Sequence, residues 1–407
     1  MYARNIAGPL RSSLVDSPVV FLQGARQTGK STLVGALGRP CYTLDDAMVF
    51  AAATADPEGF VCGLPDGAVI DEVQRVPRLA VALKASVDRD RRASRFLLTG
   101  SAGLAVLPAL SDALVGRMDV LTLWPLSQGE LRGVREGWID RAFSGDWSCG
   151  DEDPLSRAQA VAAVIAGGYP EALSRPAPAA RDRWFAAYAL TLLQREVREL
   201  ARIDDMGALT RLLALLAARS GQVQNVADLG RALAVPQTTL TRWMAMLEGT
   251  FLVRRIPAWT ADLGRRLLKS PKVVLTDSGL AAHLMGADAA RLDQQPALFG
   301  PLLEGFVSNE LVRAASWSRT RPTLHHLRTA DGVEVDLVLE DRAGRLVGVE
   351  IKATASVATS DFRGLRMLAD CAGDRFVGGV VLHLGERAVP FGDRLHALPL
   401  GCLWSSQ

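Results

Sequence analysis

The chain has 407 residues, 49% of them hydrophobic and 22% charged, with 46 Lys+Arg against 44 Asp+Glu. This composition predicts a globular protein of about two or three domains and excludes a disordered or collagen-like chain. The net charge of +2 excludes a uniformly basic nucleic-acid binder but leaves room for a local basic patch. Only five of the 46 basic residues are lysine, namely Lys30, Lys84, Lys269, Lys272 and Lys352. Genome composition alone can produce such a bias, so it carries no functional signal by itself.

The cysteines and the N-terminus predict a cytoplasmic protein. The five cysteines are scattered and form no C-x-x-C pair, which predicts neither a disulfide framework nor a structural zinc site. They are Cys41, Cys62, Cys149, Cys371 and Cys402. The first residues lack the apolar core of a signal peptide, and no run approaches the ~18 apolar residues of a membrane span. We therefore expect a reducing compartment and no contact with a membrane.

An apolar run at residues 19–22 leads into GARQTGKST, which has the G-x-x-x-x-G-K-[ST] spacing of a phosphate-binding loop. Glycines let backbone N–H groups turn toward the phosphates, and the following helix adds partial positive charge. Lys30 is expected to reach the β- and γ-phosphates of ATP, and Ser31 to bind Mg²⁺. The candidate nucleotide-binding residues of the loop are Gly24, Ala25, Arg26, Gln27, Thr28, Gly29, Lys30, Ser31 and Thr32. The alternative is a glycine-rich turn before a helix, which the scarcity of lysine disfavours.

Two further strands are predicted to border the nucleotide. The segment GAVIDEVQ at residues 67–74 is apolar and then doubly acidic, so Asp71 is expected to hold magnesium through water and Glu72 to orient or deprotonate the attacking water. A strand at residues 95–101 ends in Thr99 and Ser101, either of which is placed to sense the γ-phosphate or the attacking water. The alternative is an ordinary strand running into a polar turn. Strands alternating with helices predict a parallel α/β sheet with the ligand at its carboxyl edge.

Arg117, near the end of this region, has two interpretations. It is either an arginine finger for a neighbouring subunit of a homo-oligomer, or a surface or salt-bridge residue. The abundance of arginine in the chain favours the second interpretation.

The motifs together resemble the AAA+ superfamily of ATPases. More narrowly, they resemble a prokaryotic family that joins such an ATPase to a C-terminal domain of long-unknown function. The segments that carry the likeness are GARQTGKST, VIDEVQRVP, FLLTGSA, LWPLS at residues 123–127 and GGYPEA at residues 167–172. The resemblance covers nearly the whole chain and implies nucleotide binding, but it says little about the physiological substrate.

The middle of the chain predicts helices and then a winged helix-turn-helix. Residues 145–181 are rich in Gly, Asp, Pro and Ala, as at a domain boundary, and residues 183–200 predict a helix. Three helices and a strand are then predicted, at residues 212–218, 225–233, 237–247 and 249–257. Asn225 is a plausible N-cap of the second of these helices. This order is that of a winged helix-turn-helix, whose last helix contacts DNA.

The helix at residues 237–247 has the pattern of a recognition helix. Leu240, Trp243 and Leu247 are expected to face the core. The residues left outward are Gln237, Thr238, Thr241 and Arg242. Residues 225–272 contain eight basic residues against three acidic ones, a patch suited to a phosphate backbone. The eight are Arg231, Arg242, Arg254, Arg255, Arg265, Arg266, Lys269 and Lys272. We therefore expect DNA as a partner, although winged helices also dock proteins.

The last third predicts a β-hairpin that brings acidic residues together. Residues 333–340 and 346–352 alternate with period two and predict two strands joined by a short turn. If the turn centres on Ala343, Asp336 lies opposite Glu350, close enough for both carboxylates to share a divalent cation.

Other side chains are predicted to join this hairpin. Lys352, on the same side as Glu350, could hold or polarise an attacking water. A helix around residues 300–315 carries Glu304, a further candidate metal ligand. His325 and His326 lie nearby, but without partner spacing they are interpreted as ordinary loop residues.

The D…E-x-K layout resembles the restriction-endonuclease-like superfamily, the PD-(D/E)xK fold. That resemblance implies Mg²⁺ bound by Glu304, Asp336 and Glu350, with Asp336, Glu350 and Lys352 acting in phosphodiester hydrolysis. Such folds also serve as binding domains, so cleavage and silent binding both stay open.

We predict an α/β protein with an AAA+-type P-loop domain over residues 1–140 and a helical connector over 141–210. A winged helix-turn-helix follows over 211–275 and an endonuclease-like α/β domain over 276–407. The predicted function is Mg²⁺-dependent ATP hydrolysis coupled to action on DNA, with or without cleavage. The alternatives are an ATP-gated DNA- or protein-binding regulator with a silent nuclease fold, and a ring that remodels proteins, in which Arg117 would matter.

Overall fold

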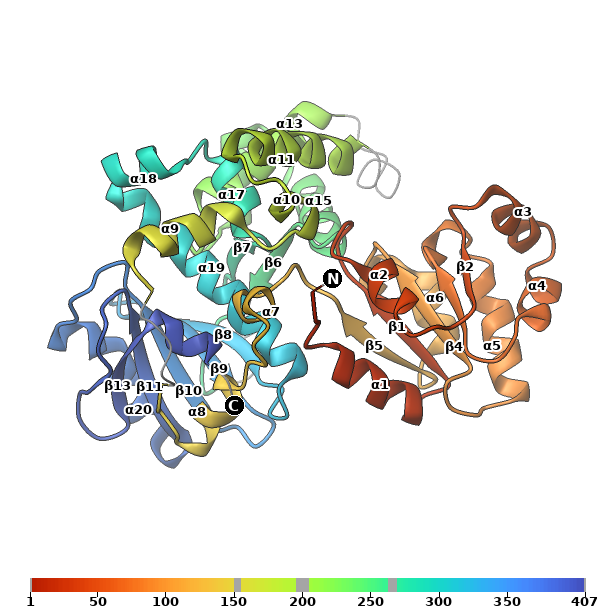
Figure 1. Cartoon of the computed structure of the whole chain (residues 1–407). Helices are drawn as coiled ribbons and strands as arrows, with labels where there is room; N and C mark the ends of the chain where they lie inside the picture. The colour runs from red at the N-terminus through yellow and green to blue at the C-terminus, as the bar shows by residue number, and fades with distance from the viewer. Residues whose placement is uncertain (1, 150–154, 195–204, 263–268, 406–407) are drawn as a thin grey trace.

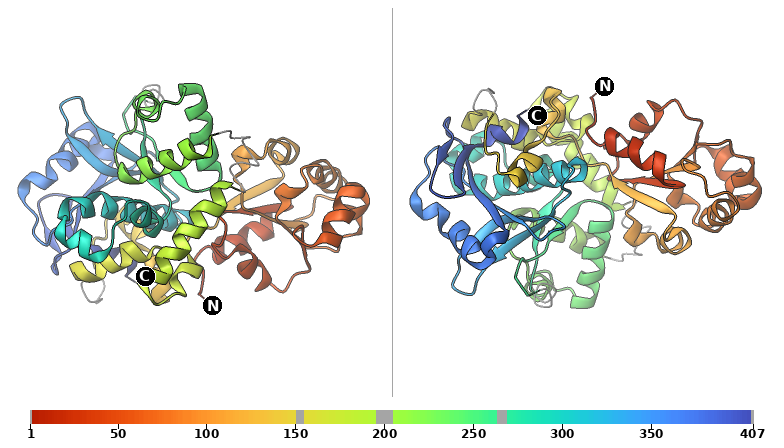
Figure 2. Two further views of the ribbon diagram at one scale, coloured as in Figure 1. Left: turned by 90° about the horizontal axis from the view of Figure 1, so that it is seen from above. Right: turned by 90° about the horizontal axis from the view of Figure 1, so that it is seen from below.

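The computed structural model describes residues 2–149, 155–194, 205–262 and 269–405. It has an N-terminal lobe built on one sheet and a C-terminal lobe built on another, with a largely helical middle part beside both (Figure 1). Views from above and below show that the N-terminal lobe projects to one side of the rest of the molecule (Figure 2). Within the described ranges, no helix combines the length and apolar character needed to cross a membrane.

The N-terminal lobe is built on a parallel sheet, as the sequence predicted, and the sheet has five strands in the order β2-β3-β4-β1-β5. Its strands are β1 (Val19–Gln23), β2 (Cys41–Thr43), β3 (Ala68–Asp71), β4 (Phe96–Gly100) and β5 (Met118–Thr122). Its helices are α1 (Ala7–Asp16), α2 (Lys30–Gly35), α3 (Ala47–Ala55), α4 (Pro57–Gly63), α5 (Leu79–Arg89) and α6 (Pro108–Leu114). Short 3-10 helices are η1 (Val73–Arg75) and η2 (Leu104–Val106).

Alternate residues of the central strand β1 enter two different cores. Val19 and Phe21 pack with α5 and α6 on one face, whereas Val20 and Leu22 pack with α1 and α2 on the other. A strand buried on both faces needs a continuous apolar run, which is the pattern seen before the phosphate-binding loop. The layering therefore places the loop at the carboxyl edge of the sheet.

The middle part contains the helices and the strand that the sequence predicted between residues 212 and 257. Its helices are α7 (Gln128–Arg132), α8 (Trp138–Ser144), α9 (Arg157–Ala166), α10 (Pro170–Leu173), α11 (Pro178–Leu192), α13 (Met206–Ala218), α14 (Val226–Leu233), α15 (Gln237–Gly249), α17 (Ser278–Leu284) and α18 (Ala289–Gln294). Strands β6 (Val253–Ile256) and β7 (Lys272–Leu275) form an antiparallel pair. The helix predicted over residues 183–200 begins earlier, at Pro178, and its last residues lie outside the described ranges.

Helices α14 and α15 follow the predicted pattern. The Asn225 side chain caps α14 by accepting a hydrogen bond from the Ala227 N–H over 2.9 Å. Leu240, Trp243 and Leu247 of α15 are buried. The predicted outward residues Gln237, Thr238, Thr241 and Arg242 are all exposed. The inward and outward faces predicted for this helix are confirmed.

The C-terminal lobe is a six-stranded mixed sheet with strand order β12-β13-β11-β10-β9-β8. Its strands are β8 (Thr323–Arg328), β9 (Glu334–Glu340), β10 (Leu346–Ile351), β11 (Phe376–His383), β12 (Val389–Pro390) and β13 (Leu395–Pro399). Its helices are α19 (Pro296–Trp317) and α20 (Arg363–Ala372), with 3-10 helices η4 (Thr359–Phe362), η5 (Gly373–Arg375) and η6 (Leu400–Trp404). Leu346 pairs with Glu340 and Val349 with Leu337, a register that continues to Glu350 opposite Asp336. The predicted hairpin register is confirmed.

The sequence predicted that His325 and His326 are loop residues, and this prediction is wrong. Both belong to the buried strand β8. Their exposed fractions are 7% and 2%. Burial lowers the pKa of His326 to about 4, so the ring is neutral and can be enclosed at little electrostatic cost. The segment TLHHLR was mistaken for a loop because two adjacent histidines obscure the period-two alternation of a strand.

The sequence predicted no disulfide framework, but the structure contains a disulfide between Cys149 and Cys402. Cys402 lies in η6, and Cys149 follows α8, which packs against η6. The two cysteines are 253 positions apart, so their proximity depends on tertiary packing and has no signature in local spacing. The disulfide fastens the segment after α8 to the end of the chain.

A thiol count tests this disulfide. Unfolded in denaturant without reductant, the protein should titrate three thiols, from Cys41, Cys62 and Cys371, and all five after reduction. A Cys149→Ser/Cys402→Ser double variant should titrate three thiols under both conditions. Five thiols before reduction, in protein purified without reductant, would contradict the pairing.

Candidate functional site

The phosphate-binding loop closes tightly over its own lysine. Gly24 has a φ of +151°, and a Cβ there would lie 2.2 Å from the Leu123 carbonyl oxygen, so the position admits only glycine. Gly29, with a φ of +95°, precedes the first turn of α2. The Lys30 ammonium is buried and donates to the carbonyls of Gly24 and Ala25 over 2.8 and 2.9 Å. A compact cation is thereby held inside the loop, where phosphate oxygens would be bound.

The remaining loop residues are held by polar contacts and by backbone shape. The Thr28 hydroxyl donates to the Ala25 carbonyl over 2.9 Å, and the Arg26 carbonyl accepts from the Tyr188 hydroxyl over 3.3 Å. Gln27 has a positive φ of 62°, which is uncommon for a residue with a side chain. Thr32 is exposed in the first turn of α2. The loop is thus fixed partly by the middle part, through α11.

Asp71 lies at the end of β3, next to two hydroxyls. The Ser31 hydroxyl donates to Asp71 Oδ2 over 3.2 Å, and the Thr99 hydroxyl donates to Asp71 Oδ1. Mg²⁺ prefers oxygen ligands and usually takes one or two from protein, completing its shell with water and phosphate. A hydroxyl and a carboxylate side by side at the loop fit that preference. Thr99, predicted to sense the γ-phosphate, also orients Asp71.

Glu72 follows in a strained turn. Its backbone is left-handed, with a φ of 60°, and such strain in a residue with a side chain is concentrated at functional sites. The Ser101 hydroxyl donates to Glu72 Oε2 over 3.2 Å, and the Gln74 amide donates both to Glu72 and, over 3.0 Å, to Ser101. Ser101, one of two candidates at the end of β4, therefore holds Glu72 in place.

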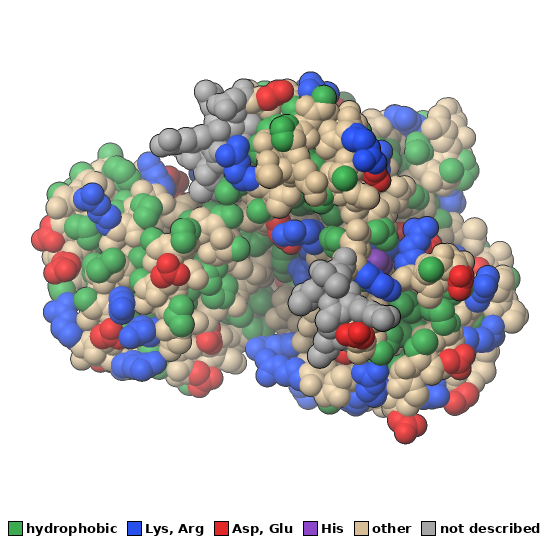
Figure 3. Space-filling view, turned by 180° about the vertical axis from the view of Figure 1, so that it is seen from behind, with side chains coloured by type: hydrophobic (Ala, Val, Ile, Leu, Met, Phe, Trp, Pro, Cys, Tyr) green, Lys and Arg blue, Asp and Glu red, His purple; other side chains and the backbone are tan. Residues whose placement is uncertain are grey.

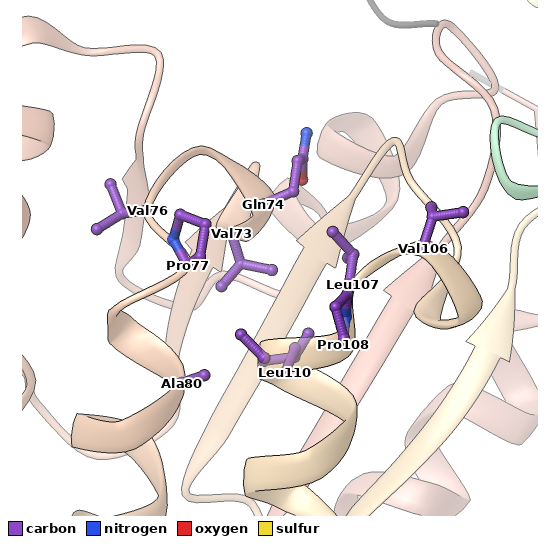
Figure 4. A pocket seen from close by; sticks show the side chains of 10 residues that line it. Val73, Gln74, Val76, Pro77, Ala80, Val106, Leu107, Pro108 and Leu110 are labelled. Atoms are coloured by element: carbon purple, nitrogen blue, oxygen red, sulfur yellow. The ribbon is translucent and has the colours of Figure 1, made fainter. Parts of the chain in front are cut away.

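An apolar cavity of about 220 Å³ borders the turn that carries Glu72. It lies between the start of α5 and the start of α6, with Gln74 pointing away from the apolar side chains (Figure 4). Its apolar lining includes Val73, Val76, Pro77, Ala80, Val106, Leu107, Pro108 and Leu110. The turn is thus bordered by apolar side chains on one side and hydrogen-bonded on the other.

A buried charge cluster that sequence reasoning missed lies behind the phosphate-binding loop. Arg4 donates to the Thr28 carbonyl over 2.7 Å and to the Trp124 carbonyl over 2.6 Å, and pairs with Glu130 over 3.2 Å. Glu136 accepts hydrogen bonds from the Ser127 hydroxyl over 2.8 Å and from the Gly129 N–H over 3.2 Å. The local signal was the capping box that Ser127 and Glu130 form in α7.

Helix α19 supplies the other half of this cluster. Glu310 is buried, and it accepts from the Gln128 N–H over 2.9 Å and from the Trp404 indole over 2.7 Å. Arg313 pairs with Glu310 and donates to the Leu126 carbonyl over 3.0 Å. The cluster joins the C-terminal lobe to the segment that follows β5, an edge strand of the N-terminal sheet.

The predicted acidic residues of the C-terminal lobe gather at one place, together with a lysine that was not predicted there. Lys272 of β7 donates to Glu304 Oε1 over 2.7 Å and lies 3.5 Å from Asp336 Oδ1. Asp336 Oδ2 accepts from the Ile351 N–H over 2.9 Å. Lys272 had been assigned to the basic DNA-binding patch, because nothing in its local sequence links it to residues 32 and 64 positions away.

Lys352 completes the cluster as the E-x-K spacing predicts. Its ammonium lies 3.0 Å from Glu350 Oε1 and 3.6 Å from Asp361 Oδ1. Burial, with the Asp336 carboxylate next in effect, raises the pKa of Glu304 to about 8 and that of Glu350 to about 7. Four carboxylates, those of Glu304, Asp336, Glu350 and Asp361, therefore share two ammonium groups.

As placed here, these carboxylates do not fit a divalent cation. Across the part of the chain that the structure describes, no three or more His, Cys, Asp or Glu side chains converge as metal ligands. Glu304 faces the Lys272 ammonium and Glu350 faces that of Lys352. Metal binding by Glu304, Asp336 and Glu350 stays a prediction from the resemblance.

The basic patch is smaller than predicted. Arg254 is half-buried, with its guanidinium 5.4 Å from the centre of the Trp124 ring. Lys272 is buried in the carboxylate cluster, and Arg231 and Arg255 pair with acidic neighbours on the surface. Counting charges along the sequence overestimated the patch because it could not distinguish buried cations from exposed ones.

Arg242 and Lys269 remain exposed, and Arg265 and Arg266 lie outside the described residues. Acidic and basic side chains are interspersed over much of the rear of the molecule (Figure 3). Arg117 pairs with Asp88 over 2.6 Å, as the salt-bridge interpretation predicted.

The parallel sheet, the loop around Lys30 and the acidic end of β3 define a P-loop nucleotide site. Residues 16–132 match the family model of an AAA domain, so the N-terminal lobe is an AAA-type P-loop ATPase domain. Residues 157–291 match a domain of unknown function, DUF8612, and residues 299–403 match another, DUF4143.

The chain belongs to the family that includes two mycobacterial proteins, "Uncharacterized protein Rv2008c" of Mycobacterium tuberculosis and "Uncharacterized protein Mb2031c" of Mycobacterium bovis. Each is 32% identical over 401 residues, covering 97% of this chain and 83% of the relative. Among solved structures, the Walker-type ATPase PABY2304 of Pyrococcus abyssi is 15% identical with a TM-score of 0.41, covering 70% of this chain and 96% of its own.

The charge cluster behind the loop predicts a pH dependence of stability. Burial, with Glu310 next, raises the pKa of Glu136 to about 8 from its usual 4.5. Between these values the folded chain keeps a proton that the unfolded chain releases, so stability falls as pH rises through this window. Glu136→Gln cannot ionise, and its fall in thermal midpoint between about pH 5 and about pH 8 should be smaller than that of the wild type.

The exposed carboxylate Glu386 provides the control. Glu386→Gln should track the wild-type midpoint at every pH. Identical pH profiles for Glu136→Gln and the wild type would contradict a retained proton at Glu136.

Proposed function

We propose that the protein is a Mg²⁺-dependent ATP hydrolase that uses its nucleotide state to reposition a DNA-binding, endonuclease-like C-terminal region. The observation that carries the hydrolase part is the contact of Ser31 with Asp71 beside the Lys30 ammonium, at the edge of an all-parallel sheet. In this interpretation Lys30 binds the β- and γ-phosphates and Glu72 orients the attacking water. Mg²⁺ held by Ser31 and Asp71 would supply positive charge toward the phosphates.

Contacts between the lobes support the coupling. Arg4 joins the carbonyl of Thr28, in the loop, to Glu130 of α7, and the first N–H of α7, from Gln128, bonds Glu310 of α19. A shift of the loop would therefore be felt at α19, which also carries Glu304 into the carboxylate cluster.

A second contact joins the ATPase domain to the helix-turn-helix. The Gly103 N–H, just beyond β4, donates to the Gly249 carbonyl at the end of α15 over 2.7 Å. A Cβ at Gly249 would lie 2.4 Å from a Val106 methyl, so the two segments are closely packed. Nucleotide-dependent motion after β4 has a direct mechanical route to α15.

Two substitutions separate ATP binding from hydrolysis. Lys30→Ala should abolish ATP binding, because the loop loses its cation. Glu72→Gln should still bind ATP but lower kcat by roughly 10²- to 10⁴-fold, because the amide cannot act as a base. Fluorescent-nucleotide binding and phosphate release measure the two steps.

Lys84, an exposed lysine on α5, is the matched control for Lys30. Lys84→Ala should bind and hydrolyse ATP like the wild type. Undiminished hydrolysis by Lys30→Ala would overturn the assignment of the loop.

The exposed face of α15 favours DNA as the partner of the middle part. Polar side chains that can meet phosphates and base edges lie along it, and Arg242 is its cation. The reduced basic patch makes this a modest electrostatic contact, in which single cations matter. Endonuclease-like folds also bind nucleic acid without cutting it, so DNA binding does not depend on cleavage.

The salt dependence of DNA binding tests this proposal. Arg242→Ala should lower the slope of log K against log salt by about 1, as expected for one lost phosphate contact. Arg11→Ala, which removes an exposed arginine from α1 of the ATPase domain, should leave the slope unchanged. Equal slopes for Arg242→Ala and the wild type would remove α15 from the DNA-binding surface.

A further inference from the structure

Lys272 is a buried cation that the middle part inserts between two carboxylates of the C-terminal lobe. Its side chain is 4% exposed, and its ammonium lies 2.7 Å from Glu304 Oε1 and 3.5 Å from Asp336 Oδ1. Two carboxylates lie within ion-pair distance of this ammonium, so its positive charge is balanced inside the protein. Ion pairs with Glu304 and Asp336 therefore hold the ammonium in place.

The backbone of Lys272 is also firmly held. Lys272 pairs with Ile256 in the β6–β7 ladder and bridges to Val223 on its other side. The neighbouring Gly221 N–H donates to the Val273 carbonyl over 3.1 Å. Lys272 cannot leave by a local change of its backbone without breaking these bonds.

The Glu304 carboxylate is enclosed from the same direction. A Cβ added to Gly221, whose φ is +77°, would lie 2.9 Å from the Glu304 carboxyl group. Gly221 and Lys272 both belong to the segment before residue 291 that matches one family model, whereas Glu304 and Asp336 belong to the next. The middle part thus forms one wall of the carboxylate site.

An ammonium and a divalent cation cannot share this place. Mg²⁺ binds carboxylate oxygens at about 2.0 to 2.1 Å, so an ion bridging Glu304 and Asp336 would lie against the Lys272 nitrogen. Contact between like charges in a buried site is strongly unfavourable. The lysine and the metal are therefore mutually exclusive ligands of the same two carboxylates.

We propose that Lys272 is a built-in cation lock, whose ammonium holds Glu304 and Asp336 in place of a divalent metal. The site becomes able to bind metal only when the wall formed by Gly221 and β7 moves away from α19. This inference rests on the endonuclease-like interpretation of the C-terminal lobe and names the regulation of that site. It also accounts for the failure of the carboxylates to converge as metal ligands.

Mn²⁺ binding to the full-length, nucleotide-free protein tests the lock, with free Mn²⁺ followed by electron paramagnetic resonance. Binding at this site is defined as Mn²⁺ binding that the Glu304→Gln substitution abolishes. The wild type and Lys272→Arg, which keeps the positive charge, should show no such binding. Lys272→Met should bind one Mn²⁺ per chain at a site that the wild type does not offer. Lys272→Met/Glu304→Gln should lose that binding.

Thermal unfolding supplies a second readout. Removing Lys272 leaves buried carboxylates without their cation, so Lys272→Met should unfold at a lower temperature than the wild type and recover when Mn²⁺ is added. Lys272→Met/Glu304→Gln should not recover. A folded Lys272→Met that binds no Mn²⁺ would overturn the lock.

The wild-type measurement is decisive even if Lys272→Met does not fold. Mn²⁺ binding by the wild type that Glu304→Gln abolishes would show that the lysine and the metal coexist, and would overturn the lock. DNA nicking by Mn²⁺-loaded Lys272→Met is scored separately. If no nicking is found, the C-terminal lobe binds DNA without cutting it. The lock itself is judged only by the Mn²⁺-binding measurements.

Discussion

Helix α19 carries ionisable side chains into the protein interior, and the arrangement of the other parts follows from the need to neutralise them. Glu310 and Arg313 are buried, and Glu304 is largely enclosed. Removing a carboxylate from water is unfavourable by several kcal/mol unless an opposite charge and hydrogen bonds replace the water. The sequence of α19 does not provide enough of these partners, so other parts of the chain must supply them.

Two clusters on α19 solve this problem in the same way. Near its C-terminal half, Glu310 pairs with Arg313 and Glu130 with Arg4, and burial followed by the charge of Glu310 raises the pKa of Glu136. In each cluster the carboxylates outnumber the two cations, and burial raises the pKa of at least one carboxyl group.

The second cluster, toward the start of α19, gathers Glu304, Asp336 and Glu350 around the ammonium groups of Lys272 and Lys352. The first cluster draws partners from the ATPase side of the molecule, and the second draws Lys272 from the middle part. Because a half-satisfied buried network is costly, displacing either partner would destabilise α19. One helix thereby becomes sensitive to the position of all three parts of the chain.

The features that could be predicted from sequence are those fixed by short-range geometry. The phosphate-binding loop needs glycines at fixed spacing, and Gly24 has a conformation and a close neighbour that exclude any side chain. The Asp336–Glu350 pairing follows from the centre of one short turn, because a hairpin's register is set by its loop. In both cases a dozen or so residues contain all the information required.

The features that could not be predicted depend on contacts between distant segments. Arg4 and Glu130 are 126 positions apart, and the bonded cysteines are 253 positions apart. No periodicity or spacing records such a contact, because it is created only when separately folded layers pack. The same reason explains the basic patch, since Lys272 is buried in the fold and Arg254 is half-buried beside Trp124.

The scarcity of lysine gains a physical meaning from the structure. Lys30, Lys272 and Lys352 each direct an ammonium at two or more oxygen atoms in a confined space, whereas Lys84 and Lys269 are exposed. A guanidinium is a wide planar fork that favours bidentate geometry, and it cannot substitute for a compact point charge with three rotatable donors. The Lys272 ammonium also occupies the place between two carboxylates where a metal ion would bind, and it carries a single positive charge there. Lysine therefore suits a narrow carboxylate site better than arginine, the common cation of this chain, although both supply the same charge.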